Sequence, residues 1–518
     1  MRTATALFAL FLVGLIAGEA QAAPRRSSGI KDPDTKAWWQ IAETLSSDAM
    51  EGRDIGSPGH HRAALVVAAR FKAAGLKAAG DNGTYLQTFA VHESRVEKVG
   101  TSFQVARADA APLNLEFLHQ ITVRATDDLP VALDAPLTFR GYCGAKELAD
   151  IKGKVVVCFN TRRTDLPSAA QRIQAAHAAD AAGLLQVDDP YFTIEPSRWP
   201  DAYARTVAIA GSTAPAAARL PVMRLSADAF KAMLAGSGQD AENILRVGGA
   251  KQPLTAFDIP GRLQAKFHVT TRDFKAENVV AVLPGRDPVL KSQYLALSAH
   301  LDSYGYGEPV NGDGLYNGTL DDAAYVGTLI RFADKHKGHP LRRSVVLAAF
   351  TGEEKGLLGA HWFVDHPTVP KASIVADINL DQLRPLFPLD IMTELAVDDT
   401  TLGTSAREVA ASMAIQIQPD PEPERGLLQR ADHWPFMQAG IPGTGFIFGY
   451  VPGTEAEKRY REWYQVRYHR PQDDLTQPMD FDAAGKFNRF FYKLAESVAD
   501  AEAEPSWTAG SRLAPKAP

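Results

Sequence analysis

The stretch SVVLAAFTGEEKGLLGA at residues 344–360 sets the expected fold of this chain. It begins as a near-continuous apolar run, which is typical of a strand buried on both faces, and Glu353 and Glu354 follow the strand. Two neighbouring carboxylates that leave a strand point in different directions, because side chains alternate along the backbone. One can therefore hold a cation while the other faces a bound water. Taken alone, such a pair is more often the solvated start of a helix.

Four further segments after Glu277 share this apolar texture. They are NVVAVLPG (278–285), QYLALSAHLD (293–302), ASIVADINLD (372–381) and TGFIFGY (444–450). The segments between them have helical length or spacing, so the pattern predicts an α/β sheet covered by helices. Apolar residues at steps of three and four between 484 and 498 predict an amphipathic helix near the end of the chain.

Composition narrows the class of partner. The chain has 518 residues, of which 45% are hydrophobic and 22% charged, with a net charge of -6. This is an ordinary globular composition, long enough for about two or three domains. No basic stripe or polybasic segment indicates nucleic acid or anionic lipid. We therefore expect a small soluble or peptide substrate.

The first residues indicate export. A charged start at Arg2, an apolar stretch at 6–18 and the small residues Ala20 and Ala22 predict a secretory signal peptide, with the mature chain beginning near Ala23. The stretch is too short for a comfortable membrane span, so we expect a secreted or periplasmic protein with no stable membrane insertion after cleavage. Export permits a disulfide between the two cysteines, Cys143 and Cys158, although two buried thiols fit their apolar surroundings equally well.

Ligand-type side chains follow the predicted strands. They are His300 and Asp302 in HLD, Asp321 and Asp322 in YNGTLDDAA, Glu353 and Glu354 in TGEEKGLLGA, Asp381 in NLD, and His469 in YHRPQDD. Active sites on such sheets gather at the carboxyl ends of the strands. Imidazoles and carboxylates are ligands that zinc prefers, and a two-metal site needs about five of them, one bridging both ions.

These motifs, in this order and at similar separations, resemble the zinc aminopeptidase family M28, in the subgroup that carries a protease-associated (PA) domain. ADIKGKVVVCFN (149–160) with AAGLLQV (181–187) is similar to the PA module, and SSDAMEGRDIGSPG (46–59) to the family's N-terminal helix entry. The resemblance implies a mixed, mostly parallel sheet flanked by helices, of the zinc-exopeptidase type. Neither an HExxH helix nor a GxSxG elbow is present in the sequence.

The resemblance also assigns roles residue by residue. It implies two Zn²⁺ ions held by His300, Asp321, Glu354, Asp381 and His469. Asp321 would be the bridging carboxylate, and His300 and Asp381 would belong to different metal environments. Glu353 would be the general base.

Two further implications concern the neighbours of these ligands. Asp302 would accept a hydrogen bond from His300 and fix the tautomer of that imidazole. The family pattern often has a cis peptide after the bridging acid, which would here join Asp321 to Asp322.

The substrate pocket is expected around ADHWPF (431–436), with Asp432 and His433 as pocket residues. We prefer His469 to His433 as a metal ligand because YHRPQDD fits the ligand motif better. Tyr325 departs from the family pattern, which usually has a small residue and then glycine after the two acids, and we place it beside the expected pocket.

The change of texture after about residue 91 and the resemblance together divide the chain. The expected parts are a signal peptide (1–22), the N-terminal part of the peptidase domain (23–130), an inserted β-rich PA domain (131–260), the M28 catalytic domain (261–503) and a disordered tail (504–518).

Three functions are compatible with the sequence. The first is an aminopeptidase that hydrolyses N-terminal residues from peptides with Glu353 as base. The second is a carboxypeptidase or amidohydrolase acting on C-terminal acidic residues, for which Arg425 and Arg430 could supply a cationic pocket. The third is a non-catalytic, receptor-like binding protein, which the complete ligand set disfavours.

Overall fold

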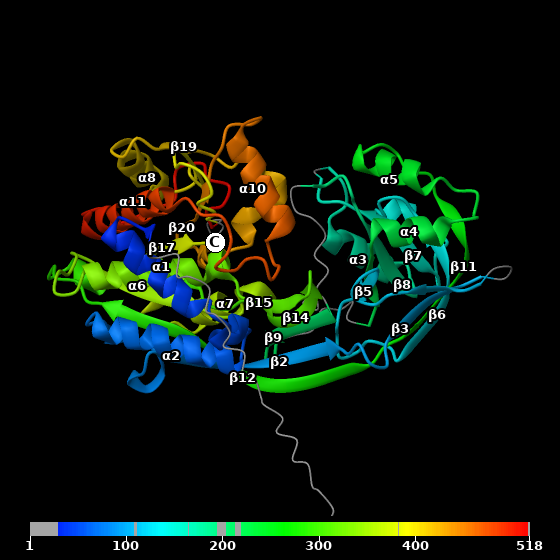
Figure 1. The fold of residues 1–518 in the computed structure, drawn as a ribbon, viewed down its shortest axis with the longest axis horizontal. Coiled ribbons are helices and arrows are strands. Elements are labelled where there is room, and N and C mark those ends of the chain that lie inside the picture. The colour runs from blue at the N-terminus through cyan, green and yellow to red at the C-terminus, as the bar shows by residue number, and fades with distance from the viewer. Residues whose placement is uncertain are drawn as a thin grey trace, which may run out of the picture.

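The computed structural model describes residues 29–107, 111–163, 165–193, 204–212, 219–381 and 383–515. The expected signal peptide lies outside these ranges. Within them, no helix combines the length and the apolar character that crossing a bilayer requires. The described chain forms two lobes, which the long strands β2 and β12 connect along one side (Figure 1).

The first lobe is built on a mixed sheet with the strand order β20-β17-β13-β16-β12-β2-β9, and β1 pairs with β12. The strands are β1 (Lys77–Ala78), β2 (Leu86–Val96), β9 (Arg205–Ile209), β12 (Val269–Leu283), β13 (Tyr294–His300), β16 (Ser344–Phe350), β17 (Ile374–Leu380) and β20 (Gly443–Thr444). β20, β17, β13 and β16 are parallel, whereas the pairs from β16 through β12 and β2 to β9 are antiparallel. The predicted α/β class is confirmed, and its parallel half carries the residues discussed below.

Helices cover both faces of this sheet. They are α1 (Pro33–Leu45), α2 (Pro58–Ala73), α6 (Ala324–Lys335), α7 (Leu358–Asp365), α8 (Leu402–Ala411), α9 (His433–Gln438), α10 (Glu455–Val466) and α11 (Phe481–Asp500). β16 shows how the sheet is buried on both sides, because Val345 and Leu347 pack in the core with α1, α2, α6 and α11, while Val346 and Phe350 pack towards α7 and α9. This alternation explains the continuous apolar run in the sequence.

Local sequence sets the ends of α2. Ser57 caps the helix by accepting a hydrogen bond from the backbone N–H of His60, and Pro58 occupies the first turn. Gly75, just beyond the last residue, has φ +85. The terminal helix α11 contains the residues 484–498 for which the sequence predicted an amphipathic helix.

The second lobe contains a separate sheet with its own core. Its strands are β3 (Ser102–Ala106), β4 (Leu113–Leu115), β5 (Ile121–Val123), β6 (Ala132–Phe139), β7 (Val155–Asn160), β8 (Gly183–Asp188), β10 (Val222–Leu225) and β11 (Phe257–Lys266), and its helices are α3 (Ala169–Ala178), α4 (Ala227–Leu234) and α5 (Ala241–Gly249). The lobe therefore begins before residue 131, the expected boundary, because β3, β4 and β5 pair within this sheet. β9, in contrast, returns to the first sheet.

Cys143 and Cys158 form a disulfide in the second lobe. Both are buried with apolar side chains that include Val156 and Leu184. The sequence alone left this pairing open.

Two small sheets complete the described fold. They are the hairpin of β14 (Gly305–Val310) and β15 (Asp313–Tyr316), and the sheet of β18 (Ile391–Glu394), β19 (Gln416–Gln418) and β21 (Phe446–Phe448).

Residues 504–515 are ordered against the first lobe, which corrects the expectation of a disordered tail. Trp507 forms a β-bridge with Thr400, and its indole N–H donates to the backbone oxygen of Gly440 at 2.9 Å. The hydroxyl of Thr508 donates to the backbone oxygen of Asp398 at 2.6 Å. Composition suggested disorder because the segment is rich in Pro, Ala and Ser, but one aromatic anchor and these bonds hold it.

Candidate active site

The parallel strands deliver polar side chains to one edge of the sheet. His300 is the last residue of β13, and Asp381 comes directly after β17, the neighbouring strand. Glu353 and Glu354 form a short 3-10 helix after β16, which lies on the other side of β13. Carboxyl ends of adjacent parallel strands meet at one edge, so these four residues converge.

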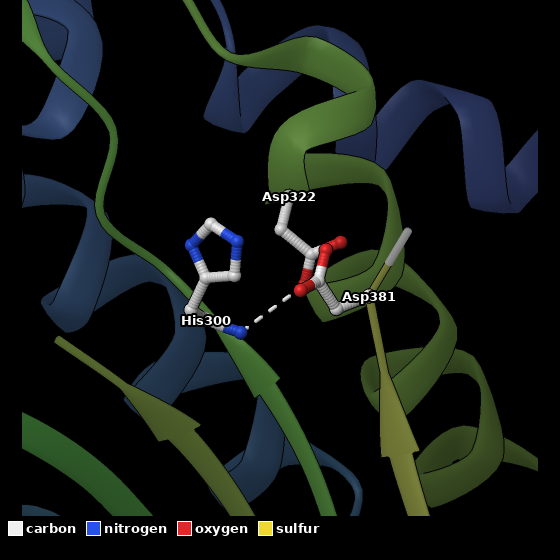
Figure 2. A group of neighbouring side chains, drawn as sticks. All are labelled: His300, Asp322 and Asp381. Carbon is white, nitrogen blue, oxygen red and sulfur yellow. Dashed lines mark hydrogen bonds between the residues drawn. The ribbon is translucent and has the colours of Figure 1, made fainter. Parts of the chain in front are cut away.

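His300, Asp322 and Asp381 form the first cluster of ligand-type side chains (Figure 2). One ligand atom from each lies within 4.8 Å of the others, and all three residues are buried. The backbone N–H of His300 donates to Oδ2 of Asp322 at 3.1 Å. His300 and Asp381 therefore share one cluster, which corrects the expectation that they serve different metal environments. They meet because β13 and β17 are paired.

Asp321, Glu354 and His469 form the second cluster. Nε2 of His469 lies 3.3 Å from Oδ2 of Asp321 and 3.2 Å from Oε2 of Glu354. His469 has φ +53, a conformation that non-glycine residues seldom adopt, and it follows α10 in the YHRPQDD segment. The structure thus brings His469 to the site, as the motif predicted.

Asp321 belongs to the second cluster and also faces the first. Its Oδ1 is 3.4 Å from Nε2 of His300, and its Oδ2 faces His469. The Asp321–Asp322 peptide is cis, as the family pattern implied. Gly318 precedes this turn at φ +58, and a Cβ there would collide with the Ser303 side chain and the backbone oxygen of Asp321. The geometry suits a bridging carboxylate, with Oδ1 facing the first cluster and Oδ2 facing the second.

Glu353 belongs to neither cluster but lies beside both. Its Oε2 is 4.0 Å from Nε2 of His300. Burial raises the pKa of its carboxyl well above the usual range, with the neighbouring charge of Glu354 adding to the shift. A carboxylate next to a metal site, with an elevated pKa, is suited to accept and return a proton.

The two clusters fit metal ions. His300 Nε2, Asp321 Oδ2 and Glu354 Oε1 are buried and have no hydrogen-bond partner within the described chain. Burial raises the pKa of Glu354 to about 8, and it raises that of Asp322 well above its usual range. Buried carboxylates of this kind need a cation to ionise at neutral pH. Imidazole and carboxylate donors are those that zinc accepts.

Comparison with known proteins agrees with this donor set. The family model described as "Peptidase family M28" matches residues 278–495, which contain every residue of both clusters. Residues 278–495 are therefore similar to peptidase family M28. The matched region includes the parallel strands and most of the helices that carry the site.

Two relatives match over part of their length. A protein named "Probable zinc metalloprotease" from Pyrenophora teres f. teres (strain 0-1) is 28% identical over 239 residues, which is 44% of this chain and 50% of that protein. "Leupeptin-inactivating enzyme 1" of Streptomyces exfoliatus is 25% identical over 323 residues, 60% of this chain and 66% of that protein. The chain spans about half to two thirds of the length of the first curated relatives it matches.

Among solved structures, the aminopeptidase from Aneurinibacillus sp. strain AM-1 superposes with a TM-score of 0.61 at 14% identity. The match covers 90% of this chain and 94% of that one. The two-lobed fold is therefore shared over nearly the whole length.

Asp302 lies beside the two clusters, although its partner differs from the expected one. Its carboxylate accepts the backbone N–H groups of Glu353 at 3.1 Å and Glu354 at 3.3 Å. Nδ1 of His300 is 3.1 Å from the backbone oxygen of Asp302 and 3.7 Å from its carboxylate. Asp302 thus orients the Glu353–Glu354 turn directly, while its main chain contacts the imidazole.

The expected pocket residues have different positions. Asp432 and His433 are fully buried at the start of α9, and His433 is in neither ligand cluster. Burial raises the pKa of Asp432 well above its usual range, although the charge of His300 opposes the shift. Tyr325 is in the core instead of a pocket, because its hydroxyl donates to the backbone oxygen of Leu383 at 3.1 Å and only 1% of its surface is exposed.

Arg53 was not singled out by the sequence, yet it ties together the loops that carry the ligands. It is fully buried, and its guanidinium donates at 2.7–2.8 Å to four backbone oxygens, those of Leu45, Leu301, Asn317 and Gly318. Leu301 follows His300, and Gly318 lies three residues before Asp321. The EGR sequence in the N-terminal motif was its only signal.

Asp473 and Arg384 hold the loop of Asp321 from the other side. The two carboxylate oxygens of Asp473 accept the backbone N–H groups of Leu320 and Asp321, each at 3.0 Å. Arg384 lies 4.3 Å above the Trp463 ring, with Nη2 3.4 Å from Oδ1 of Asp321. Burial would raise the pKa of Asp321, but the charge of Arg384 and the contacts with two imidazoles hold it well below its usual range.

Proposed function

We propose that this chain is an exported aminopeptidase that holds two Zn²⁺ ions and removes N-terminal residues from peptides. The observation that carries the proposal is the position of Glu353 beside the two three-residue ligand clusters. Asp321 of the second cluster also faces His300 of the first. His300, Asp322 and Asp381 would hold one ion, and Asp321, Glu354 and His469 the other, with Asp321 facing both.

In this proposal, Glu353 and Asp302 have different roles in the reaction. Zinc in these clusters would acidify a water and polarise the peptide carbonyl. Glu353 would take a proton from the attacking water and pass it to the leaving amine. Asp302 would keep Glu353 and Glu354 pointing in different directions, because it binds both of their backbone N–H groups.

Aminopeptidase activity is favoured over carboxypeptidase activity. The name of the solved relative supports it, and the cationic pocket that the alternative requires is not supported by the arginines proposed for it. Arg425 is buried, donates to the Tyr460 hydroxyl at 2.7 Å and lies 4.6 Å above the Tyr464 ring. Arg430 donates to the Tyr468 hydroxyl at 3.0 Å. These contacts give both guanidinium groups a structural role.

Export is supported by the Cys143–Cys158 disulfide, since such bonds persist in oxidising compartments. We propose a secreted or periplasmic location, with the mature chain beginning near Ala23, which N-terminal sequencing of the purified protein would test. The second lobe would be the PA domain inserted into the peptidase, as the 149–160 motif suggests.

Peptide cleavage with matched end groups tests the proposed activity. One peptide should be offered with both ends free, with its N-terminus acetylated, and with its C-terminus amidated. We expect hydrolysis of the first and third only, loss of hydrolysis with a chelator, and recovery on adding zinc. Cleavage of the acetylated peptide together with resistance of the amidated one would favour a carboxypeptidase. A purified chain without zinc or chelator-sensitive cleavage would favour a binding protein.

A further inference from the structure

Tyr304 lies against the second ligand cluster, in the turn between β13 and β14. Its hydroxyl is 2.7 Å from Nδ1 of His469, and the two rings are 4.7 Å apart at their centroids. It belongs to the aromatic stretch DSYGYGEP (302–309). Its neighbour in that stretch, Tyr306, is 67% exposed.

The two nitrogens of His469 face different partners. Nε2 faces Asp321 and Glu354, at 3.3 and 3.2 Å, and is therefore the nitrogen placed for a metal ion. A neutral imidazole that binds metal through Nε2 carries its proton on Nδ1. That N–H would donate to the oxygen of the Tyr304 hydroxyl.

The same hydroxyl has a second partner in the cluster. It also acts on the Glu354 carboxylate, because hydrogen bonding from Tyr304 opposes the rise that burial causes in the pKa of Glu354. Because Nδ1 of His469 supplies a proton to its oxygen, the hydroxyl can direct its own proton to Glu354. One hydroxyl thus joins two residues that share a cluster, once as acceptor and once as donor.

The ring that carries this hydroxyl is held by its surroundings. Nζ of Lys355 is 4.5 Å from the ring centroid of Tyr304, and the Tyr316 ring is 6.2 Å away on centroids. Lys355 directly follows Glu354, so the turn that supplies the carboxylate also packs on the ring. The hydroxyl is therefore presented to the cluster in a defined direction.

We propose that Tyr304 is a positioning residue that orients His469 and Glu354 for one metal ion through a single hydroxyl. The inference rests on the proposed function, because it concerns the metal of the Asp321–Glu354–His469 cluster. Outer hydrogen-bond partners of metal ligands typically change metal affinity by about 10- to 100-fold when they are removed. The His300–Asp322–Asp381 cluster contains neither His469 nor Glu354, so its affinity should be unchanged.

The test is a zinc titration of the mature protein with the Tyr304→Phe variant, which keeps the ring and removes the hydroxyl. Tyr306→Phe is the matched control, because it removes a hydroxyl two residues away on an exposed side chain. A chelating dye would measure the affinity of each zinc equivalent, and Co²⁺ absorption would report the ligand geometry of each site.

We expect Tyr304→Phe to bind one equivalent like the wild type and the other about 10- to 100-fold more weakly, with an altered Co²⁺ spectrum for that equivalent. Excess zinc should restore its peptidase activity, and its urea midpoint without metal should match that of the wild type. Equal affinities in variant and wild type, or equal weakening of both equivalents, would overturn the role of Tyr304. A wild type that binds no zinc would instead refute the proposed function.

Discussion

Replacing Arg53 with methionine should destabilise the metal-free protein by about 4 kcal/mol. The guanidinium is fully buried and donates to four backbone oxygens that come from three separate segments of the chain. Methionine has a similar length but donates nothing, so it leaves those oxygens without their partner.

The magnitude follows from two opposing effects. Hydrogen bonds to a charged group contribute about 1.5–3 kcal/mol each, so four bonds at the lower end of that range contribute about 6–8 kcal/mol. Burial lowers the pKa of Arg53 from 12.5 to about 10, which corresponds to a cost of about 3 kcal/mol for burying the charge. The difference leaves about 4 kcal/mol, a large share of the stability of a typical domain.

Urea unfolding of the metal-free protein, followed by far-ultraviolet circular dichroism, would measure this loss. Arg62→Met is the matched control, since Arg62 is 44% exposed and is paired with the Glu51 carboxylate and the Ala49 carbonyl. We expect that control to lose under about 1 kcal/mol. A loss for Arg53→Met as small as that of the control would refute the view that Arg53 anchors the ligand loops.

Three other predictions concern stability. Replacing both Cys143 and Cys158 with serine should lower the free energy of unfolding by about 3 kcal/mol, because the disulfide closes a loop with a sequence separation of 15. Reductant should lower the urea midpoint of the wild type but not that of the variant. Burial lowers the pKa of His60 to about 3 from 6.5, so the unfolded chain binds the extra proton and the stability falls as the pH drops from 6.5 towards 3. In urea titrations, His60→Leu should therefore lose about 2 kcal/mol less stability than the wild type between pH 6.5 and 4.5. Equal losses in the two proteins would contradict the assignment. Trp507→Ala should release the C-terminal segment, so amide exchange at Thr401, whose N–H bonds to the Ser506 oxygen, should accelerate; unchanged exchange would count against the anchor.

Sequence patterns predicted the features that depend on local order. β16 could be recognised because both of its faces are apolar, and α11 because its apolar residues recur at steps of three and four. Ligand-type residues were also recognisable, since each follows a strand or lies in a family motif. Such features require only neighbours in the chain.

Features that depend on distant segments were not predictable. Arg53 donates hydrogen bonds to carbonyls up to 265 residues away in the sequence, and no local sequence pattern predicts that contact. Asp322 joins His300 only through the fold of the intervening hairpin. Tyr325 was placed near a pocket because it follows the two acids, but the turn of α6 directs its ring into the core.

The Glu353→Gln variant tests the proton-transfer role of Glu353. Glutamine keeps the size of the side chain but cannot accept the proton, and Glu353 lies outside both ligand clusters. Zinc content and kcat should be measured together for Glu353→Gln and for Glu354→Gln. We expect Glu353→Gln to keep two zinc ions per chain while kcat falls by about 10²- to 10⁴-fold, and Glu354→Gln to lose zinc. A Glu353→Gln protein that keeps its zinc and cleaves peptides as fast as the wild type would contradict that role.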